Sequence, residues 1–189
     1  NEEDGIQIID YPDVSDRKIL IRNNIISNSS MAAIGYTSNG NTKENYEAAQ
    51  IEERILIYNN TLFNNTYGIT GGGNSIILNN IIAHTKHIAL KGVKGNSIAA
   101  YQNLYQNGTN FSDCNIEENT ITYLNPNFKE NYFLPDYSPL INQGVHEFWF
   151  SNELFKIHSI SGKEPISIGC EKEGFSGWFH QRDTIKFLN

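Results

Sequence analysis

The sequence predicts an all-β fold, a right-handed parallel β-helix (a solenoid) with a C-terminal aromatic cap. A short phrase of branched aliphatic residues around an Asn-Asn pair begins at Ile19, at Ile55 and at Ser75, and a degraded copy begins at Ser97. The second Asn recurs at steps of 20 residues, from Asn60 to Asn80, and 23 residues, from Asn80 to Asn103. A period of this size is typical of stacked repeat architectures. A third apolar segment, often beside Gly, follows each pair.

Each copy of the phrase predicts a short strand, a sharp corner and a second short strand. Ile and Leu suit a pleated surface, whereas Asn tolerates the left-handed backbone of a corner and hydrogen-bonds its own backbone. In stacked coils the same Asn lies above and below itself, so that the side-chain amides pair in a ladder. We therefore expect Asn24, Asn60 and Asn80 to stack at one corner. The aliphatic residue two positions after each of them is expected to point inward.

The third apolar segments, at 33–35, 68–70 and 87–90, complete a coil of three strands and three corners. Residues 5–8 match this third strand, so we expect the chain to begin in the middle of a coil. Asn24 and Asn60 are 36 residues apart, which exceeds one coil and predicts an insertion at about 37–53. Such insertions commonly form the wall of a binding groove, although a solvated loop explains the segment as well.

The coils are predicted to occupy residues 1–125, and residues 126–189 are predicted to form the last coil and the cap. From residue 126 onward Pro and aromatic residues replace the Asn phrases. The aromatic segments 147–155 and 175–179 are candidates for the cap, because an uncovered last coil exposes an edge that invites aggregation. The alternative for a Trp exposed in this region is stacking on a sugar.

The residues quoted above and the end of the chain resemble the broad family of secreted right-handed β-helix proteins. This family includes polysaccharide lyases, epimerases, pectinase-like hydrolases and surface adhesins. Segments 124–128 (LNPNF), 132–144 (YFLPDYSPLINQG) and 168–171 (IGCE) are similar to the "DPxF", "L-x-P-x-SPxIDxG" and "IGAxE" segments that end many bacterial members. The resemblance covers most of residues 5–172. It implies the fold and a secreted or cell-surface location, but no particular chemistry, because one scaffold hosts many functions.

The composition excludes several classes of function. The 189 residues carry a formal net charge of −7 and a sequence pI near 5.2, whereas binding of nucleic acid favours a basic stripe. No segment approaches the roughly 18 apolar residues of a membrane span. No Cys/His pattern has metal-site spacing, so neither a metal nor a cofactor is expected. Cys114 and Cys170 are interpreted as separate core or turn residues, with a disulfide between them as the alternative.

The most regular coils, residues 54–107, contain no Asp or Glu. A pectinase-like hydrolase needs paired carboxylates, and a calcium-dependent lyase needs a carboxylate cluster. Both are therefore disfavoured there. A metal-independent lyase or epimerase remains open, because Lys, His, Tyr or Arg can neutralise a uronate and remove a proton.

Cations gather instead in one coil. The turn from Ile88 to Asn96 is three residues longer than the turn from Ile69 to Asn74, so the Lys-bearing segment 91–95 is expected to bulge out above a glycine shelf. The predicted glycan-binding residues are His84, His87, Lys91, Lys94, Gly71, Gly72 and Gly73. The alternative is ordinary corner glycines and solvated lysines, with His84 as a corner residue in the place of Asn64.

The sequence thus predicts a secreted or cell-surface module that recognises a polysaccharide or another glycan, or that acts as a scaffold. One alternative is a polysaccharide lyase or epimerase that acts on uronate-containing glycans, with its catalytic coils partly upstream. No catalytic residue is identified in the chain, so this enzymatic interpretation ranks second. Another alternative is a structural subunit of a surface assembly, in which a protein partner or upstream coils stack on the N-terminal coil.

Overall fold

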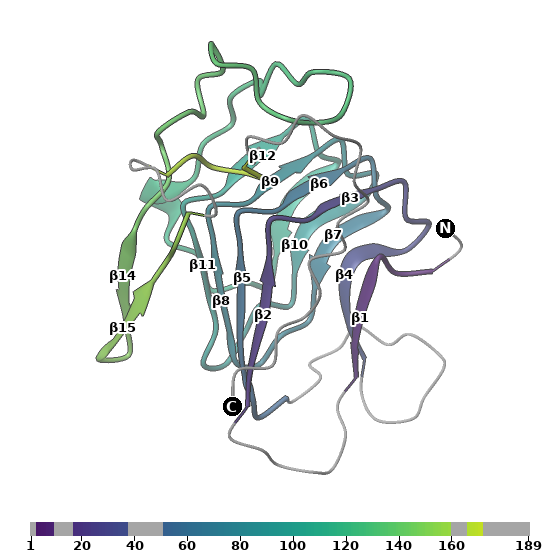
Figure 1. Ribbon diagram of the computed structural model, residues 1–189. Helices are drawn as coiled ribbons and strands as arrows, with labels where there is room; N and C mark the ends of the chain where they lie inside the picture. The colour runs from purple at the N-terminus through teal and green to yellow at the C-terminus, as the bar shows by residue number, and fades with distance from the viewer. Residues whose placement is uncertain (1–2, 10–16, 38–50, 160–165, 172–189) are drawn as a thin grey trace.

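The computed structural model describes residues 3–9, 17–37, 51–159 and 166–171, which form an all-β structure of stacked parallel strands (Figure 1). Sheet A contains β1 (Ile6–Ile9), β4 (Ala32–Thr37), β7 (Tyr67–Thr70), β10 (Ile88–Lys91) and β13 (Thr109–Ser112). Sheet B contains β2 (Lys18–Arg22), β5 (Arg54–Tyr58), β8 (Ser75–Leu78) and β11 (Ile98–Ala100). Sheet C contains β3 (Ile25–Ser27), β6 (Thr61–Phe63), β9 (Ile81–Ala83) and β12 (Asn103–Tyr105).

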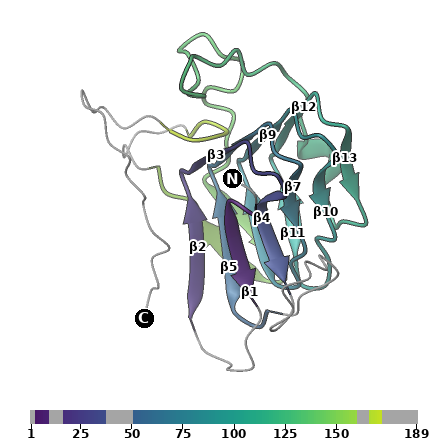
Figure 2. The ribbon, with the colours of Figure 1, turned by 90° about the vertical axis from the view of Figure 1, so that its right-hand side faces the viewer.

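The chain passes through sheets B, C and A in turn, and each such passage forms one coil. Strands β2, β3 and β4 form the first coil, and each later group of three stacks on the one before it (Figure 2). The stacking is in register: Leu62 pairs with Ile26 of the preceding coil and with Ile82 of the next. The predicted all-β class and this inward column are therefore confirmed, and the arrangement fits a parallel β-helix.

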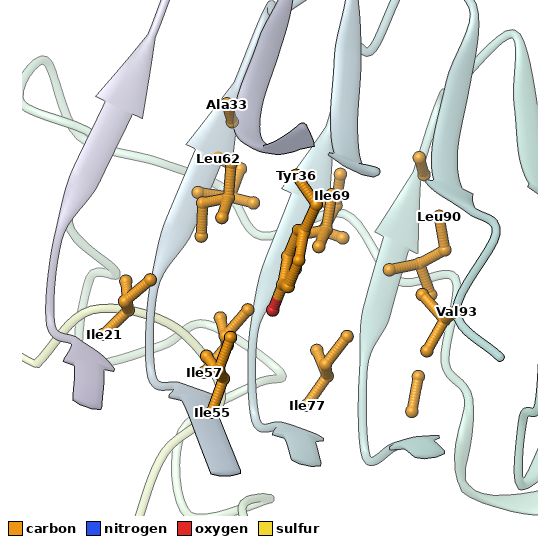
Figure 3. Close-up of a cluster of buried hydrophobic side chains, with 14 of the residues drawn as sticks. Ile21, Ala33, Tyr36, Ile55, Ile57, Leu62, Ile69, Ile77, Leu90 and Val93 are labelled. Carbon is orange, nitrogen blue, oxygen red and sulfur yellow. The ribbon is translucent and has the colours of Figure 1, made fainter. Parts of the chain in front are cut away.

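The core is a narrow column of aliphatic side chains enclosed by the three sheets (Figure 3). Ile21, Ile57 and Ile77 follow one another in sheet B and are each at most 1% exposed. One large aromatic residue interrupts this pattern, because Tyr36 is fully buried among the aliphatic side chains. The space for its ring lies beside Gly71 of the next coil, which has no side chain to fill it.

The predicted asparagine ladder is present at the corner between sheets B and C. Asn24 Nδ2 donates to Asn60 Oδ1 at 2.9 Å, and Asn60 Nδ2 donates to Asn80 Oδ1 at 2.9 Å. The same two oxygens also accept the main-chain N–H groups of Asn24 and Asn60, each at 3.0 Å. Since Asn60 and Asn80 are fully buried, the ladder satisfies polar groups that would be costly to leave unpaired.

The first Asn of each pair has a different role from the second. Asn23, Asn59 and Asn79 have φ values of 53°, 54° and 53°, in the left-handed region that Asn tolerates better than most residues. They turn the corner, so the second Asn is free to point inward. The Asn-Asn pair therefore combines a corner residue with a ladder residue.

The fourth coil departs from the predicted register by one residue. Ala100 pairs with Leu78, which places Gln102, and not Asn103, beside Asn80. Asn103 pairs with Ile81 in sheet C. Gln102 Nε2 donates to the carbonyl oxygens of Ile77 and Ala100, but its buried Oε1 accepts no hydrogen bond. The ladder acceptor is thus lost where Gln replaces Asn.

Replacing Gln102 by Asn is expected to raise the free energy of unfolding by about 1 kcal/mol. The shorter side chain would bring its oxygen to the position that Asn80 Oδ1 occupies in the preceding step of the ladder, where it accepts two hydrogen bonds. Urea denaturation of the variant and of the wild-type protein measures the difference. Gln102→Ala is the control and should lower stability; a Gln102→Asn variant no more stable than wild type would contradict the explanation.

The C-terminal part of the chain lies along the sides of the coils. An antiparallel hairpin of β14 (Glu147–Phe150) and β15 (Glu153–Lys156) follows the short 3-10 helix η1 (Glu118–Thr120) and the loop after it. The hairpin lies beside sheet B, where Phe155 and Ile157 are buried with Tyr58 and Leu78 (Figure 1). Trp149 is 67% exposed on the opposite face of the hairpin, so sugar stacking by this residue remains a prediction.

A second segment, residues 166–171, runs back along the outer corner toward the first coil. Leu140 and Ile168 are buried against the outer side of sheet C. Gly169 N donates to Asn79 O at 2.7 Å, and Glu171 N donates to Asn23 Oδ1 at 3.3 Å. The described part of 126–189 therefore covers the sides of sheets B and C. Residues 38–50 of the predicted insertion and the aromatic segment 175–179 lie outside the described residues.

The two cysteines lie far apart and are both free, so the disulfide alternative is wrong. Val93 N donates to Cys114 Sγ at 3.5 Å near the last coil, whereas Cys170 N donates to Thr61 Oγ1 at 3.0 Å between the first two coils. Burial, with a smaller contribution from the neighbouring Glu171 carboxylate, raises the pKa of the Cys170 thiol to about 12. Cys170 is therefore a protonated packing residue at neutral pH.

Candidate functional site

The strands of sheet A are bent, and the bend determines which side chains face solvent. Two consecutive residues of β10, Ala89 and Leu90, are both fully buried in the core. The same holds in β7, where Ile69 is fully buried and a Cβ on Gly68 would lie 2.7 Å from Ile82 Cγ2. Alternation is broken at these pairs: Ile88 and Lys91 on either side of the β10 pair are half-buried, as is Tyr67 before the β7 pair, whereas Thr70 after it is fully buried.

Tyr67 and Lys91 meet on the outer side of this bend. Lys91 pairs with Thr70 in the sheet, yet its Nζ lies 5.7 Å from the centroid of the Tyr67 ring. The His87 ring lies on the same tyrosine, with 5.4 Å between ring centroids and an interplanar angle of 48°. His87 is exposed, and the other two side chains are half-buried. An aromatic face attracts a cation through its quadrupole, so this arrangement keeps an ammonium group beside an aromatic ring.

The outer surface of sheet A is open toward its last strands and closed toward its first. Thr109 and Ser112 pair with Ile88 and Lys91, and all four are exposed or half-buried. In the preceding coils Ala32, Gly35 and Thr70 are buried, and the Asp4 carboxylate fills the space that a Cβ on Gly35 would occupy. We call the open part, composed of Tyr67, His87, Ile88, Lys91, Thr109 and Ser112, the sheet A surface.

The structure separates the two lysines that the sequence predicted to act together. Lys91 contacts the Tyr67 ring, and it has no ion-pair partner among the described residues. Lys94 forms an ion pair with Asp113 of the next coil. Of the predicted cations, His87 and Lys91 thus lie together, whereas Lys94 already has a carboxylate partner.

His84 lies at the corner between sheets C and A and faces away from the sheet A surface. Its ring packs against Phe63 at 4.9 Å and Tyr105 at 5.7 Å between centroids. It has a φ of 56°, and Asn64 in the preceding coil has a φ of 53°. Its interpretation as a corner residue in the place of Asn64 is therefore confirmed, and its ring belongs to an aromatic cluster on sheet C.

The glycine segment lies directly beside the lysine turn, as the spacing predicted. Gly71 N donates to Lys91 O at 2.8 Å, and Lys94 N donates to Gly72 O at 3.1 Å. However, a Cβ on Gly71 would lie 2.5 Å from Tyr36 Cβ, and Gly71 and Gly72 are both buried. The open side of Gly71 thus faces the core and is filled by Tyr36.

Tyr36 is held in that space by a buried hydrogen bond. Its hydroxyl lies 2.6 Å from Ser75 Oγ. Burial raises the pKa of Tyr36, an effect that the Ser75 hydrogen bond only partly opposes. The residue is therefore a neutral phenol with a structural role, and it does not contribute to the sheet A surface.

Several further features bear on what the surface can do. Among the described residues no group of three or more His, Cys, Asp or Glu side chains is placed to hold a metal ion. In the same part of the chain no helix is long and apolar enough to cross a membrane. Tyr67 was not predicted as a site residue; the only sequence signal was an aromatic residue directly before Gly68-Ile69, one coil ahead of Lys91.

Comparisons of the chain with protein-family models, with curated proteins and with solved structures found no match.

Proposed function

We propose that the chain forms a right-handed parallel β-helix and belongs to a secreted or cell-surface protein, and that the sheet A surface binds an anionic glycan. The observation that supports this proposal is the packing of His87 and the Lys91 ammonium group on the Tyr67 ring. A tyrosine ring offers an apolar face and a polar tip at the edge of water. The Lys91 ammonium group, held beside this ring, would bind the carboxylate of an acidic sugar.

The charge distribution also favours an anionic ligand at this position. The chain carries a net charge of −7, yet residues 54–107 contain no Asp or Glu, and of their lysines Lys94 is paired with Asp113 whereas Lys86 and Lys91 form no ion pair with a described residue. Lys86 is exposed next to His87 of the sheet A surface. A local cationic area on an acidic protein attracts anions to one place and repels them elsewhere. A uronate-containing polysaccharide has both the carboxylates and the sugar rings that this surface would contact.

The proposed site predicts that Tyr67→Ala and Lys91→Ala each weaken binding of a uronate oligosaccharide about tenfold, a loss of about 1.4 kcal/mol. Titration calorimetry with oligogalacturonate measures the affinity, which should also fall with added salt. Lys156→Ala is the matched control, because Lys156 pairs with Glu147 on the hairpin beside sheet B. Melting temperatures of the Lys91→Ala and Lys156→Ala variants should stay close to that of wild type.

The outcomes of this titration separate the proposals. Binding of neutral oligosaccharides only, or an equal loss in the Lys156 control, would contradict the glycan site. An increase in ultraviolet absorbance during incubation with polyuronate would instead indicate unsaturated ends and a lyase. In that case His87, Lys91 and Tyr67 are the groups to test as proton acceptor and donor.

A structural role in an assembly is the second proposal, supported by the N-terminal end of the ladder. Asn60 and Asn80 each accept two hydrogen bonds at Oδ1, but no described residue donates to Asn24 Oδ1. Strands β2 and β3 are the outermost strands of their sheets at this end. A further coil with Asn at the same corner would extend both features, and sedimentation of the purified chain tests for association.

A further inference from the structure

We propose that Asp113 restricts the sheet A surface to one anion-binding position, at Lys91, by occupying Lys94. This inference rests on the proposed glycan binding and adds a specificity-determining residue to it. Asp113 offers Lys94 the same chemical group, a carboxylate, that a uronate ligand would bring. Asp113 therefore competes with a ligand carboxylate for Lys94.

The stacking of two turns places Asp113 beside the turn that carries the lysines. Gly92 N donates to Ser112 O at 3.0 Å, and Asn115 N donates to Val93 O at 2.8 Å. The turn that carries Lys91 and Lys94 therefore lies on the turn that carries Asp113, one coil later. Asp113 has a φ of 58°, which makes it the corner residue of that turn. Its position beside the lysine turn is thus determined by the backbone.

The ion pair is exposed to solvent, so it contributes little to stability, but a ligand carboxylate must still displace it to reach Lys94. The side chains of Lys94 and Asp113 are 49% and 65% exposed, and exposed pairs contribute about 0–1 kcal/mol. A ligand carboxylate at Lys94 has to replace an equivalent carboxylate, so the exchange gains almost nothing. At Lys91 the ligand displaces no carboxylate of the described residues.

The charge of Asp113 also affects which glycans fit. A second ligand carboxylate placed beside the last coil would approach Asp113, and like charges at short distance repel each other. The surface should therefore prefer a glycan in which the acidic sugar at Lys91 is followed by a neutral sugar. A polymer with a carboxylate on every sugar should bind less well than its charge alone suggests.

The test is a comparison of Asp113→Asn with wild type in binding to oligogalacturonate. Asn tolerates the left-handed backbone at this corner, so the variant should fold normally. The affinity is expected to rise about threefold to fivefold, with a steeper dependence on salt. Lys94→Ala should leave the wild-type affinity nearly unchanged, whereas Lys94→Ala combined with Asp113→Asn should remove the gain. Asp136→Asn, in an exposed loop, is the control for net charge.

The results separate this inference from the proposed function. If wild type binds and Asp113→Asn binds equally well, the competitor role is overturned while the glycan site stands. A gain that persists in the double variant, or that Asp136→Asn reproduces, would show that Lys94 is not involved and would also overturn it. If neither wild type nor Asp113→Asn binds any anionic oligosaccharide, the glycan site and the competitor role are both overturned.

Discussion

Replacing Gly71 by Ala is expected to lower the free energy of unfolding by about 3 kcal/mol, through two separate costs. Gly71 has a φ of 78°, which a residue with a Cβ adopts only at a cost of about 1–2 kcal/mol. In addition, the new Cβ would lie 2.5 Å from Tyr36 Cβ. Overpacking of a core at a site that cannot move typically costs about 1–3 kcal/mol. Chemical denaturation measures the total.

Gly95→Ala is the matched control for the backbone cost, with a milder steric contact than at Gly71. Gly95 has a φ of 61°, it is exposed, and the atom nearest to a Cβ added there would be Gly73 O at 3.0 Å. Its replacement should cost about 1–2 kcal/mol. Equal losses for the two variants would show that Tyr36 does not occupy the space beside Gly71. If Gly71→Ala left stability unchanged but weakened glycan binding, residues 71–73 would be a ligand surface, as the sequence predicted.

Asn60→Ala is expected to cost about 3 kcal/mol, because it removes the central member of the ladder. The Asn60 side chain accepts two hydrogen bonds from Asn24 and donates to Ile21 O, Tyr58 O and Asn80 Oδ1. The residue is fully buried, so no water replaces the lost partners. The unfolding midpoint in urea, with the slope of the transition, gives the change in free energy.

Asn131→Ala is the corresponding control on the surface. Asn131 is exposed, so its replacement should change stability by less than about 0.5 kcal/mol. Similar losses for Asn60 and Asn131 would remove the ladder from the explanation of stability.

The repeat and its corners were predictable because they depend on local chemistry. A run of branched aliphatic residues followed by Asn-Asn determines the strand, the left-handed corner and the inward-pointing amide within a few neighbouring residues. The register of the fourth coil was mistaken because Asn103 was matched to Asn80 by residue type. The spacing from Ser75 to Asn80 equals that from Ser97 to Gln102, so strand length identifies the correct partner.

The candidate site was less predictable because it depends on contacts between coils. Strict alternation along β7 would place Tyr67 on the same side as Ile69, and only the bend at Gly68 turns it outward beside Lys91. The Lys94 ion pair needs the exact stacking of two turns that differ in sequence. The cations themselves were visible in the sequence, whereas their partners were not.

The contacts that Val145 and the returning segment 166–171 make with the corner asparagines have a consequence for how the molecule unfolds. In a stack where each repeat touches only its neighbours, terminal repeats fray independently and unfolding is gradual. Here Asn79 binds Val145 through both its amide nitrogen and its oxygen, and Asn23 and Asn59 bind Glu171. These links join positions 66 to 148 residues apart in the chain. Coils that do not touch each other are thereby coupled, which favours a cooperative, all-or-none transition and slow folding that ends with docking of this segment.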